Sequence, residues 1–217
     1  MGTVAVGGLT ELDAVTLDLY GTVVTLRDPA PKLVETLRAH GVDRTPEAVH
    51  AAFEAEFAYY DPHSHEGRDE PSVADLNRRC AKVFLEALGA ELDPAEFAPL
   101  YVAALEFEPL AGAPDALRAL RSRGLELVAV TNWDVTVHEQ LSDLGLAPFC
   151  SHVVTSAEVG ARKPDPAPFR RALDLLQVLP ERALHIGDGG VVDRQGATAA
   201  GMRFAFAPLE RALAELL

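Results

Sequence analysis

Three acidic side chains stand at the ends of apolar segments, where they could do chemistry together. Asp18 lies within the run "AVTLDL" (14–19), and Asp188 and Asp193 follow the run "ALHIG" (183–187). In an open α/β sheet the carboxyl ends of parallel strands form the ligand crevice, so these groups should converge there. Three close carboxylates raise one another's pKa unless a cation neutralises them, and hard oxygen ligands of this kind favour Mg²⁺. The pattern predicts a magnesium site that would also accept a phosphate.

The segments that must position these residues alternate between two periodicities. Buried parallel strands are predicted at 14–19, 125–131, 183–187 and 202–206, with a weaker strand at 151–156. Between them, helical segments open with proline or end at glycine, as in "GAPDALRALRSRG" and "KPDPAPFRRALDLLQ". Strand and helix in alternation predict an α/β fold, a Rossmann-like core with a parallel sheet.

The block 28–107 breaks this alternation and predicts an all-helical insertion with no strand. Four helices are expected, at 30–39, 46–60, 73–88 and 94–107. Thr45 is the expected N-cap of the second, and Ser72 with Asp75 the expected capping box of the third.

Four short motifs, taken together and in order, resemble the haloacid dehalogenase-like (HAD) hydrolases. They are "DLYGT" (18–22), "TN" (131–132), "RKPDP" (162–166) and "GDGGVVDRQGA" (187–197). Each motif alone has an ordinary reading as a turn or a helix start, but four in this order do not. The resemblance extends to the C1-capped subfamily I and to the subgroup of haloacid dehalogenase-like domain-containing protein 3 and DREG-2. It implies a core domain of residues 1–27 and 108–217 and a helical cap domain of residues 28–107.

The resemblance also implies a role for each matching residue. Asp18 would be the nucleophile, and Thr131 and Asn132 would orient the transferring group. Lys163 would neutralise charge on the nucleophile and on the phosphoryl oxygens. The remaining implied role is to hold Mg²⁺, through the side chains of Asp18 and Asp188, the backbone carbonyl of Tyr20, and Asp193 directly or through water.

Residue 20 raises the question of which hydrolase this is. Phosphatases of the family usually carry a second aspartate there, which protonates the leaving oxygen and then activates water. General acid or base help is worth roughly 10²- to 10⁴-fold, and a tyrosine with a pKa near ~10 replaces it poorly at neutral pH.

Three hypotheses follow. The leading one is a Mg²⁺-dependent phosphatase acting on a small phosphorylated metabolite through an aspartyl intermediate. The second is a 2-haloacid dehalogenase, because those enzymes share the pattern D-x-Y-G-T; they differ, however, at the positions of Asp188 to Gly190, and no cap arginine stands out beyond the guesses Arg27 and Arg68. The third is a weakly active or inactive binding or regulatory protein.

The bulk composition excludes some classes and leaves other questions open. Nineteen Lys and Arg against 33 Asp and Glu give a formal charge of -14, the wrong sign for a nucleic-acid binder. We expect no signal peptide and no membrane span, and with only Cys80 and Cys150 a cytoplasmic location is the simplest expectation. A small-molecule substrate is predicted, without its identity, and the oligomeric state stays open.

Several other residues have a structural interpretation that we prefer to a functional one. His63 and His65 are expected to be solvated, His185 a satisfied core residue, Trp133 rim packing and Asp134 the N-cap of the next helix. The aromatic residues at helical spacing in the second insert helix are expected to form the cap core, and one of their rings could line the crevice: Phe53, Phe57, Tyr59 and Tyr60.

Overall fold

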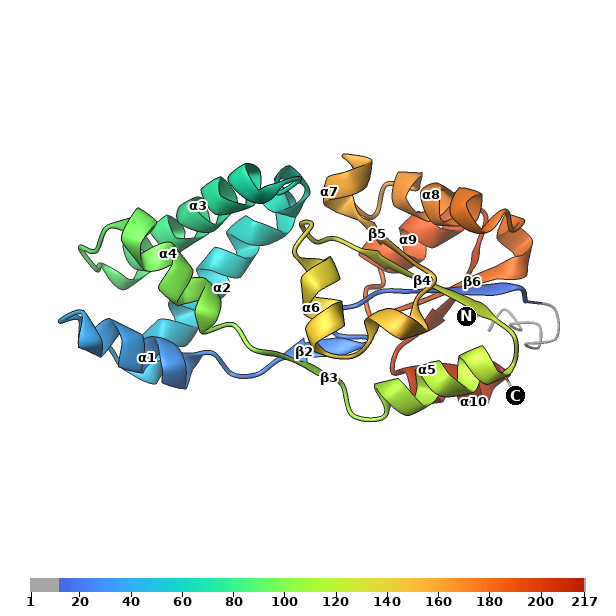
Figure 1. Cartoon of the computed structure of the whole chain (residues 1–217), viewed down its shortest axis with the longest axis horizontal. Coiled ribbons are helices and arrows are strands. Elements are labelled where there is room, and N and C mark those ends of the chain that lie inside the picture. Colours follow the sequence, from blue (N-terminus) through green and yellow to red (C-terminus); the bar gives the residue numbers. More distant parts are fainter. Residues whose placement is uncertain (1–11, 217) are drawn as a thin grey trace.

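The computed structural model describes residues 12–216, and a parallel sheet of five strands lies at its centre (Figure 1). Residues 1–11 and residue 217, which belong to the predicted core domain, lie outside this range. The strand order is β5-β4-β1-β6-β7. The strands are β1 (Ala14–Leu17), β4 (Glu126–Thr131), β5 (His152–Thr155), β6 (Ala183–Gly187) and β7 (Arg203–Phe206). All five predicted strands are confirmed, and the α/β class with them.

The first strand ends two residues earlier than predicted because the chain turns back at Leu19. The carbonyl oxygen of Leu19 accepts hydrogen bonds from the backbone N–H groups of Thr22, Val23 and Val24, at 3.1, 2.8 and 2.9 Å. These bonds close a tight loop directly after β1. The loop holds Asp18 and Tyr20 at the carboxyl edge of the sheet.

Helices cover both faces of the sheet, which explains why its strands are apolar on both sides (Figure 1). On one face, Val15 and Leu17 share a core cluster with residues of α5 (Ala113–Ser122), α6 (Val137–Asp143) and α10 (Leu209–Leu216). On the other face, Ala14 and Val128 pack with α8 (Ala167–Leu176) and α9 (Val192–Ala199). Short helical turns occupy α7 (Ser156–Val159), Ala147–Phe149 and Pro180–Arg182.

The helical insertion forms a separate layer with a core of its own (Figure 1). Its four helices are confirmed: α1 (Ala30–Ala39), α2 (Pro46–His63), α3 (Glu70–Leu88) and α4 (Pro94–Ala103), with a short 3₁₀ turn at Ser64–Glu66. Thr45 caps α2 as predicted, its hydroxyl accepting from Ala48 N. We call this layer the cap.

The capping box of α3 lies three residues earlier than predicted. Asp69 is the N-cap and exchanges hydrogen bonds with Ser72, so the helix begins at Glu70 rather than at residue 73. Asp75 instead pairs with Arg78 and Arg79. The observed pair, Asp69 with Ser72, and the predicted pair, Ser72 with Asp75, both have the three-residue spacing of a capping box. Pro71 is tolerated in the first turn of the helix that starts at Glu70.

Two short strands join the cap to the core and flank the helical insertion. β2 (Val24–Leu26) pairs antiparallel with β3 (Phe107–Pro109), so the last cap helix stops at Ala103 instead of residue 107. Arg27, just beyond β2, donates to Glu106 and Glu108 at 3.1 and 2.8 Å. This pairing joins segments about eighty residues apart, which local periodicity cannot reveal. In residues 12–216, no helix is both long and apolar enough to cross a membrane.

Candidate active site

The three carboxylates predicted to converge do so at the carboxyl edge of the sheet. One oxygen each of Asp18, Asp188 and Asp193 lies within 4.8 Å of the others. Asp18 follows β1, and Asp188 and Asp193 follow β6, its hydrogen-bonded neighbour. Gly21 makes this approach possible, because its φ is +80° and a Cβ there would lie 2.2 Å from the Asp188 Oδ2 atom.

Lys163 is the cation of this cluster. Its ammonium donates to Asp18 Oδ1 and to Asp193 Oδ1, each at 2.6 Å, and the residue is only 2% exposed. A buried ammonium between two buried carboxylates is the compensated arrangement that low-dielectric surroundings require. Lys163 therefore lies beside Asp18, and its role in neutralising charge on a nucleophile stays a prediction.

Asn132 holds the backbone of Lys163. Its Oδ1 accepts from Lys163 N at 2.8 Å, and its Nδ2 donates to Lys163 O at 3.1 Å. Thr131, at the end of β4, is buried and lines the same cavity. The predicted roles of Thr131 and Asn132 in orienting a transferring group stay predictions. What the contacts add is that Asn132 fixes the loop that carries the lysine.

The cluster shifts the pKa of its members in opposite directions. Burial raises the pKa of Asp18, and the Lys163 ammonium opposes that shift. Burial acts the same way on Asp193, but hydrogen bonds from His185 and Lys163 bring the pKa of Asp193 well below its ordinary value. Burial would lower the pKa of Lys163, yet Asp18 and Asp193 raise it. Lys163 therefore stays protonated at neutral pH.

His185 is a buried and partnered residue, as expected, but its partner belongs to the site. Its Nδ1 lies 2.8 Å from the hydroxyl of Thr16, and its Nε2 lies 3.2 Å from Asp193 Oδ1. Burial lowers the pKa of His185, so the ring is neutral and the nitrogen facing the carboxylate carries the proton. Because side chains alternate along β6, His185 lies on the sheet face that packs with α9, the helix that carries Asp193. The contact between the two residues could have been predicted from this alternation.

Tyr20 lies at the mouth of the site and is 37% exposed. Burial and the neighbouring Asp188 carboxylate raise the pKa of its phenol, which makes Tyr20 a neutral group rather than a base at physiological pH. Its ring faces the cap, with its centroid 5.7 Å from that of Phe57.

A cavity of about 370 Å³ lies between the carboxyl edge of the sheet and the cap. Asp18, Lys163 and Asp188 line one end, and residues of α2, α3 and α4 line the other. The prediction that the aromatic group of α2 forms the cap core was wrong in part. Phe53, Phe57 and Tyr60 line this cavity, and Phe57 is 41% exposed.

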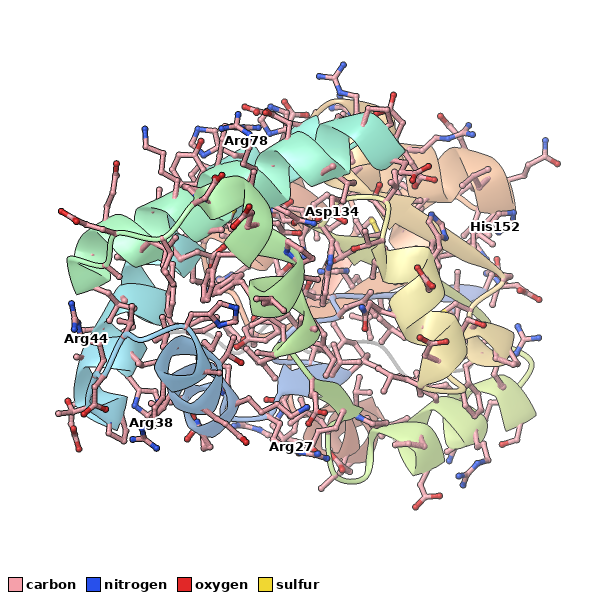
Figure 2. All side chains as sticks on the ribbon, turned by 60° about the vertical axis from the view of Figure 1, so that its left-hand side comes forward. Arg27, Arg38, Arg44, Arg78, Asp134 and His152 are labelled. Atoms are coloured by element: carbon pink, nitrogen blue, oxygen red, sulfur yellow. The ribbon has the colours of Figure 1, made fainter. Side chains whose placement is uncertain are left out.

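The cap contacts the core through the end of α2 and the turn that follows. The Tyr60 hydroxyl donates to Asp134 Oδ2 at 2.9 Å, and Arg162 donates to Asp61 at 2.5 Å. Figure 2 shows Asp134 in the middle of the molecule, between cap helices and core. The predicted N-cap role of Asp134 needs correction: α6 begins at Val137, and Asp134 accepts from the N–H and hydroxyl of Thr136 one turn earlier.

The remaining weak candidates also have defined places. Trp133 is buried at the cavity wall, against the ring of Phe107 at 4.9 Å between centroids. His63 and His65 are half-buried rather than solvated: His63 stacks on Tyr59, and the Nδ1 of His65 is buried without a hydrogen-bond partner in residues 12–216.

The donor set suits Mg²⁺, because all three candidate side chains offer carboxylate oxygens. They are not equally available. Asp193 Oδ1 accepts from Lys163 and His185, and its Oδ2 accepts from Gly189 N at 2.9 Å. Asp18 and Asp188 therefore offer a cation more unengaged carboxylate oxygens than Asp193 does.

Comparisons with known proteins show what the chain is similar to. The model of the haloacid dehalogenase-like hydrolase family matches residues 12–201. The human haloacid dehalogenase-like hydrolase domain-containing protein 3 is 32% identical over 88% of this chain and 80% of its own. The phosphoserine phosphatase of Thermus thermophilus is 36% identical over 71% of this chain and 63% of its own.

Solved structures of two kinds share the fold. The HAD-hydrolase YfnB of Bacillus subtilis, bound to magnesium, matches with a TM-score of 0.70 and 22% identity over 90% of this chain and 88% of that one. The L-2-haloacid dehalogenase of Xanthobacter autotrophicus matches with a TM-score of 0.67 and 21% identity over 90% and 77%. At such identities the likeness is one of fold alone.

Proposed function

Because this chain belongs to the haloacid dehalogenase-like hydrolase family, we propose that it is a Mg²⁺-dependent phosphatase of a small phosphorylated metabolite, with Asp18 as its nucleophile. The observation that carries this proposal is the set of three carboxylates within 4.8 Å beside a buried lysine. A site with that many carboxylates is electrostatically suited to a divalent cation and a phosphate together, and less so to an organic acid alone.

In the proposed reaction, a carboxylate oxygen of Asp18 attacks phosphorus and the bond from phosphorus to the leaving oxygen breaks. Lys163 stays protonated and neutralises charge on the nucleophile and on the phosphoryl oxygens. Asn132 keeps Lys163 in register, and Thr131 lies close enough to the cavity to donate to the transferring group. Water then hydrolyses the aspartyl phosphate and regenerates Asp18.

Asp18, Asp188 and the backbone carbonyl of Tyr20 would hold Mg²⁺, with Asp193 as an outer partner. When bound, the ion would neutralise the phosphate oxygens and align them with Asp18. The boundaries that we propose for the two units are residues 1–27 with 108–217 for the core and 28–107 for the cap. The paired strands β2 and β3 lie at these boundaries and are the place where the cap would move.

A dehalogenase remains the second candidate because of Tyr20, but neither arginine guessed for its substrate carboxylate is available in the cavity. The cations guessed for a substrate carboxylate are engaged elsewhere: Arg27 with Glu106 and Glu108, and Arg68 with the carbonyl of His65. Neither residue lines the cavity. Phosphate or metabolite binding without turnover would instead favour the third candidate, a binding or regulatory protein.

The test is a metal-dependence assay on one panel that contains both phosphate monoesters and 2-haloacids. The proposal expects phosphate release that requires Mg²⁺ and stops on adding a chelator, and no halide release. Halide release from 2-chloropropionate without metal, or no phosphate release from any compound, would refute it. Asp18→Asn must abolish the activity in either enzyme case, so it tests the nucleophile but not the reaction class.

A further inference from the structure

The walls of the cavity above Asp18 are aromatic. The rings of Tyr20 and Phe57 lie 5.7 Å apart between centroids, tilted by 40°, and both are partly exposed on the cavity side. Phe53 continues this wall at 6.5 Å from Phe57, and Trp133 with Phe107 forms a second one. Exposed ring surface inside a cavity is the surface on which a flat apolar group gains most, because aromatic pairs add to simple burial.

The charge of the cavity is the second observation. Among the described residues that line it, Lys163 is the one cation, and it is already bound by Asp18 and Asp193. The ionisable groups toward the cap are acidic. Glu56 is buried there and accepts from the Tyr101 hydroxyl at 2.7 Å, and Asp61, Asp134 and Glu139 lie farther along the wall. A substrate with a second anionic group would find no partner for it and would face carboxyl groups.

The basic residues of the cap do not change this balance. Figure 2 shows Arg38, Arg44 and Arg78 at the outside of the cap, away from the labelled Asp134. Arg79 is bound to Glu66, Asp75 and the hydroxyl of Tyr59. None of these four side chains lines the cavity.

The third observation concerns the proton that a departing oxygen needs. The resemblance implies that a carboxyl group at position 20 supplies this proton, and here Tyr20, partly exposed with its ring against Phe57, offers a phenol instead. Asp134, one of the carboxylates farther along the wall, accepts from Thr136 with one oxygen and from Tyr60 with the other. A substrate suited to this site therefore has a leaving oxygen that departs without being protonated. A phenolate departs in this way far more readily than an alkoxide.

We propose that the substrates of this site are aryl phosphate monoesters whose aromatic part carries no negative charge. The inference rests on the proposed phosphatase function and names its substrate class. An Asp18 oxygen forms the bond to phosphorus, and the bond from phosphorus to the aryl oxygen breaks. The phenolate leaves with the electron pair and takes its proton from water, and a second water then cleaves the aspartyl phosphate to inorganic phosphate.

Three probes test the proposal with Mg²⁺ present: 4-carbamoylphenyl phosphate, 4-carboxyphenyl phosphate and acetyl phosphate. The first two have nearly the same shape and differ in charge, and the third has a good leaving group without a ring. We expect kcat/KM to be about tenfold or more higher for the carbamoyl than for the carboxyl compound, because the carboxylate is desolvated without a partner. Equal or reversed rates for that pair, with acetyl phosphate hydrolysed, would overturn the substrate class and leave the phosphatase intact. No hydrolysis of any probe would overturn both.

Two matched variants on α4 test the charge argument separately. Val102 lines the cavity and Leu100 does not, while the two are 38% and 37% exposed. Val102→Arg supplies the missing cation, so the ratio of carboxyl to carbamoyl turnover should rise by about twofold to fivefold. Leu100→Arg adds the same charge outside the cavity and should leave the ratio unchanged. An equal change in both variants would refute a specific role for the cation-free wall.

A second matched pair tests the ring surface. Phe57→Ala should lower the ratio of kcat/KM for 4-carbamoylphenyl phosphate to that for acetyl phosphate by about threefold to tenfold, because a ring contact is lost. Leu100→Ala is the control in the same cap and should not lower it. No fall in Phe57→Ala would contradict the proposed aromatic site.

Discussion

Replacing Lys163 with methionine should destabilise the metal-free protein strongly. Methionine keeps most of the side-chain volume but removes the ammonium that bonds Asp18 and Asp193 at 2.6 Å. Breaking a buried ion pair by removing one partner costs about 3–5 kcal/mol, because the other charge stays buried without compensation. For a chain of this size, each kcal/mol lowers Tm by about 2–4 °C, so we expect a fall of about 6–20 °C.

The pH dependence of that penalty has a definite sign. Burial raises the pKa of Asp18, and without the opposing Lys163 ammonium that pKa rises further, so the folded variant holds this proton more tightly than the unfolded chain and its stability falls as pH rises. The difference in Tm between the variant and the wild type should thus be larger at pH 8 than at pH 5. Mg²⁺ should raise the Tm of Lys163→Met more than that of the wild type, because the ion restores positive charge beside Asp18 and Asp188.

The assay is thermal unfolding of both proteins at two pH values, with Mg²⁺ and with chelator. Lys82→Met is the matched control, since Lys82 is exposed and its ion pair with Glu86 is 3.7 Å long. That variant should change the free energy of unfolding by less than about 1 kcal/mol. If Lys163→Met has the same Tm as the wild type in chelator at pH 8, the lysine does not compensate the charge of the carboxylates.

Three further predictions concern single residues. Tyr20→Asp should restore an acid and base and raise kcat for alkyl phosphates by about tenfold or more, and an unchanged kcat on an alkyl series would show that another group already does this. Burial raises the pKa of Glu56, so the folded state holds this proton more tightly than the unfolded chain, and Glu56 destabilises the fold as pH rises past its unfolded pKa. The urea midpoint of Glu56→Gln, relative to that of the wild type, should therefore increase from pH 4 to pH 8. A constant difference would contradict a raised pKa. Burial raises the pKa of Cys150 to about 11, so iodoacetamide should label it slowly at pH 8 and much faster in urea, and equal rates, by mass spectrometry of the Cys150 peptide, would refute the shift.

The part of the site built from strand ends could be predicted from the sequence. Asp18 and Asp188 directly follow apolar runs, and parallel strands bring such ends to one edge, so their convergence needed no knowledge of distant contacts. Lys163 was different. It follows no strand, and its approach to Asp18 depends on a loop held by Asn132, so it was predicted from the resemblance of its motif alone.

Contacts between the cap and the core could not be predicted from local patterns. The bond from Tyr60 to Asp134 joins residues 74 positions apart, and periodicity placed Tyr60 on a helix face without saying what it would meet. The pairing of β2 with β3 was not predicted for the same reason, because three-residue strands carry almost no pattern of their own. The aromatic lining of the cavity was missed for a related reason: Phe57 is apolar and at helical spacing, yet it faces a cavity rather than a core.

The most direct test of the central claim is a chemical trap of the intermediate on Asp18. The protein is mixed with Mg²⁺ and acetyl phosphate, quenched in acid within the first turnovers and reduced with borohydride, and the peptide of residues 12–26 is sequenced by mass spectrometry. The account predicts conversion of Asp18 to homoserine only when both metal and substrate are present, and none in Asp18→Asn. Continued phosphate release with residue 18 unmodified, or modification at another carboxylate, would contradict it.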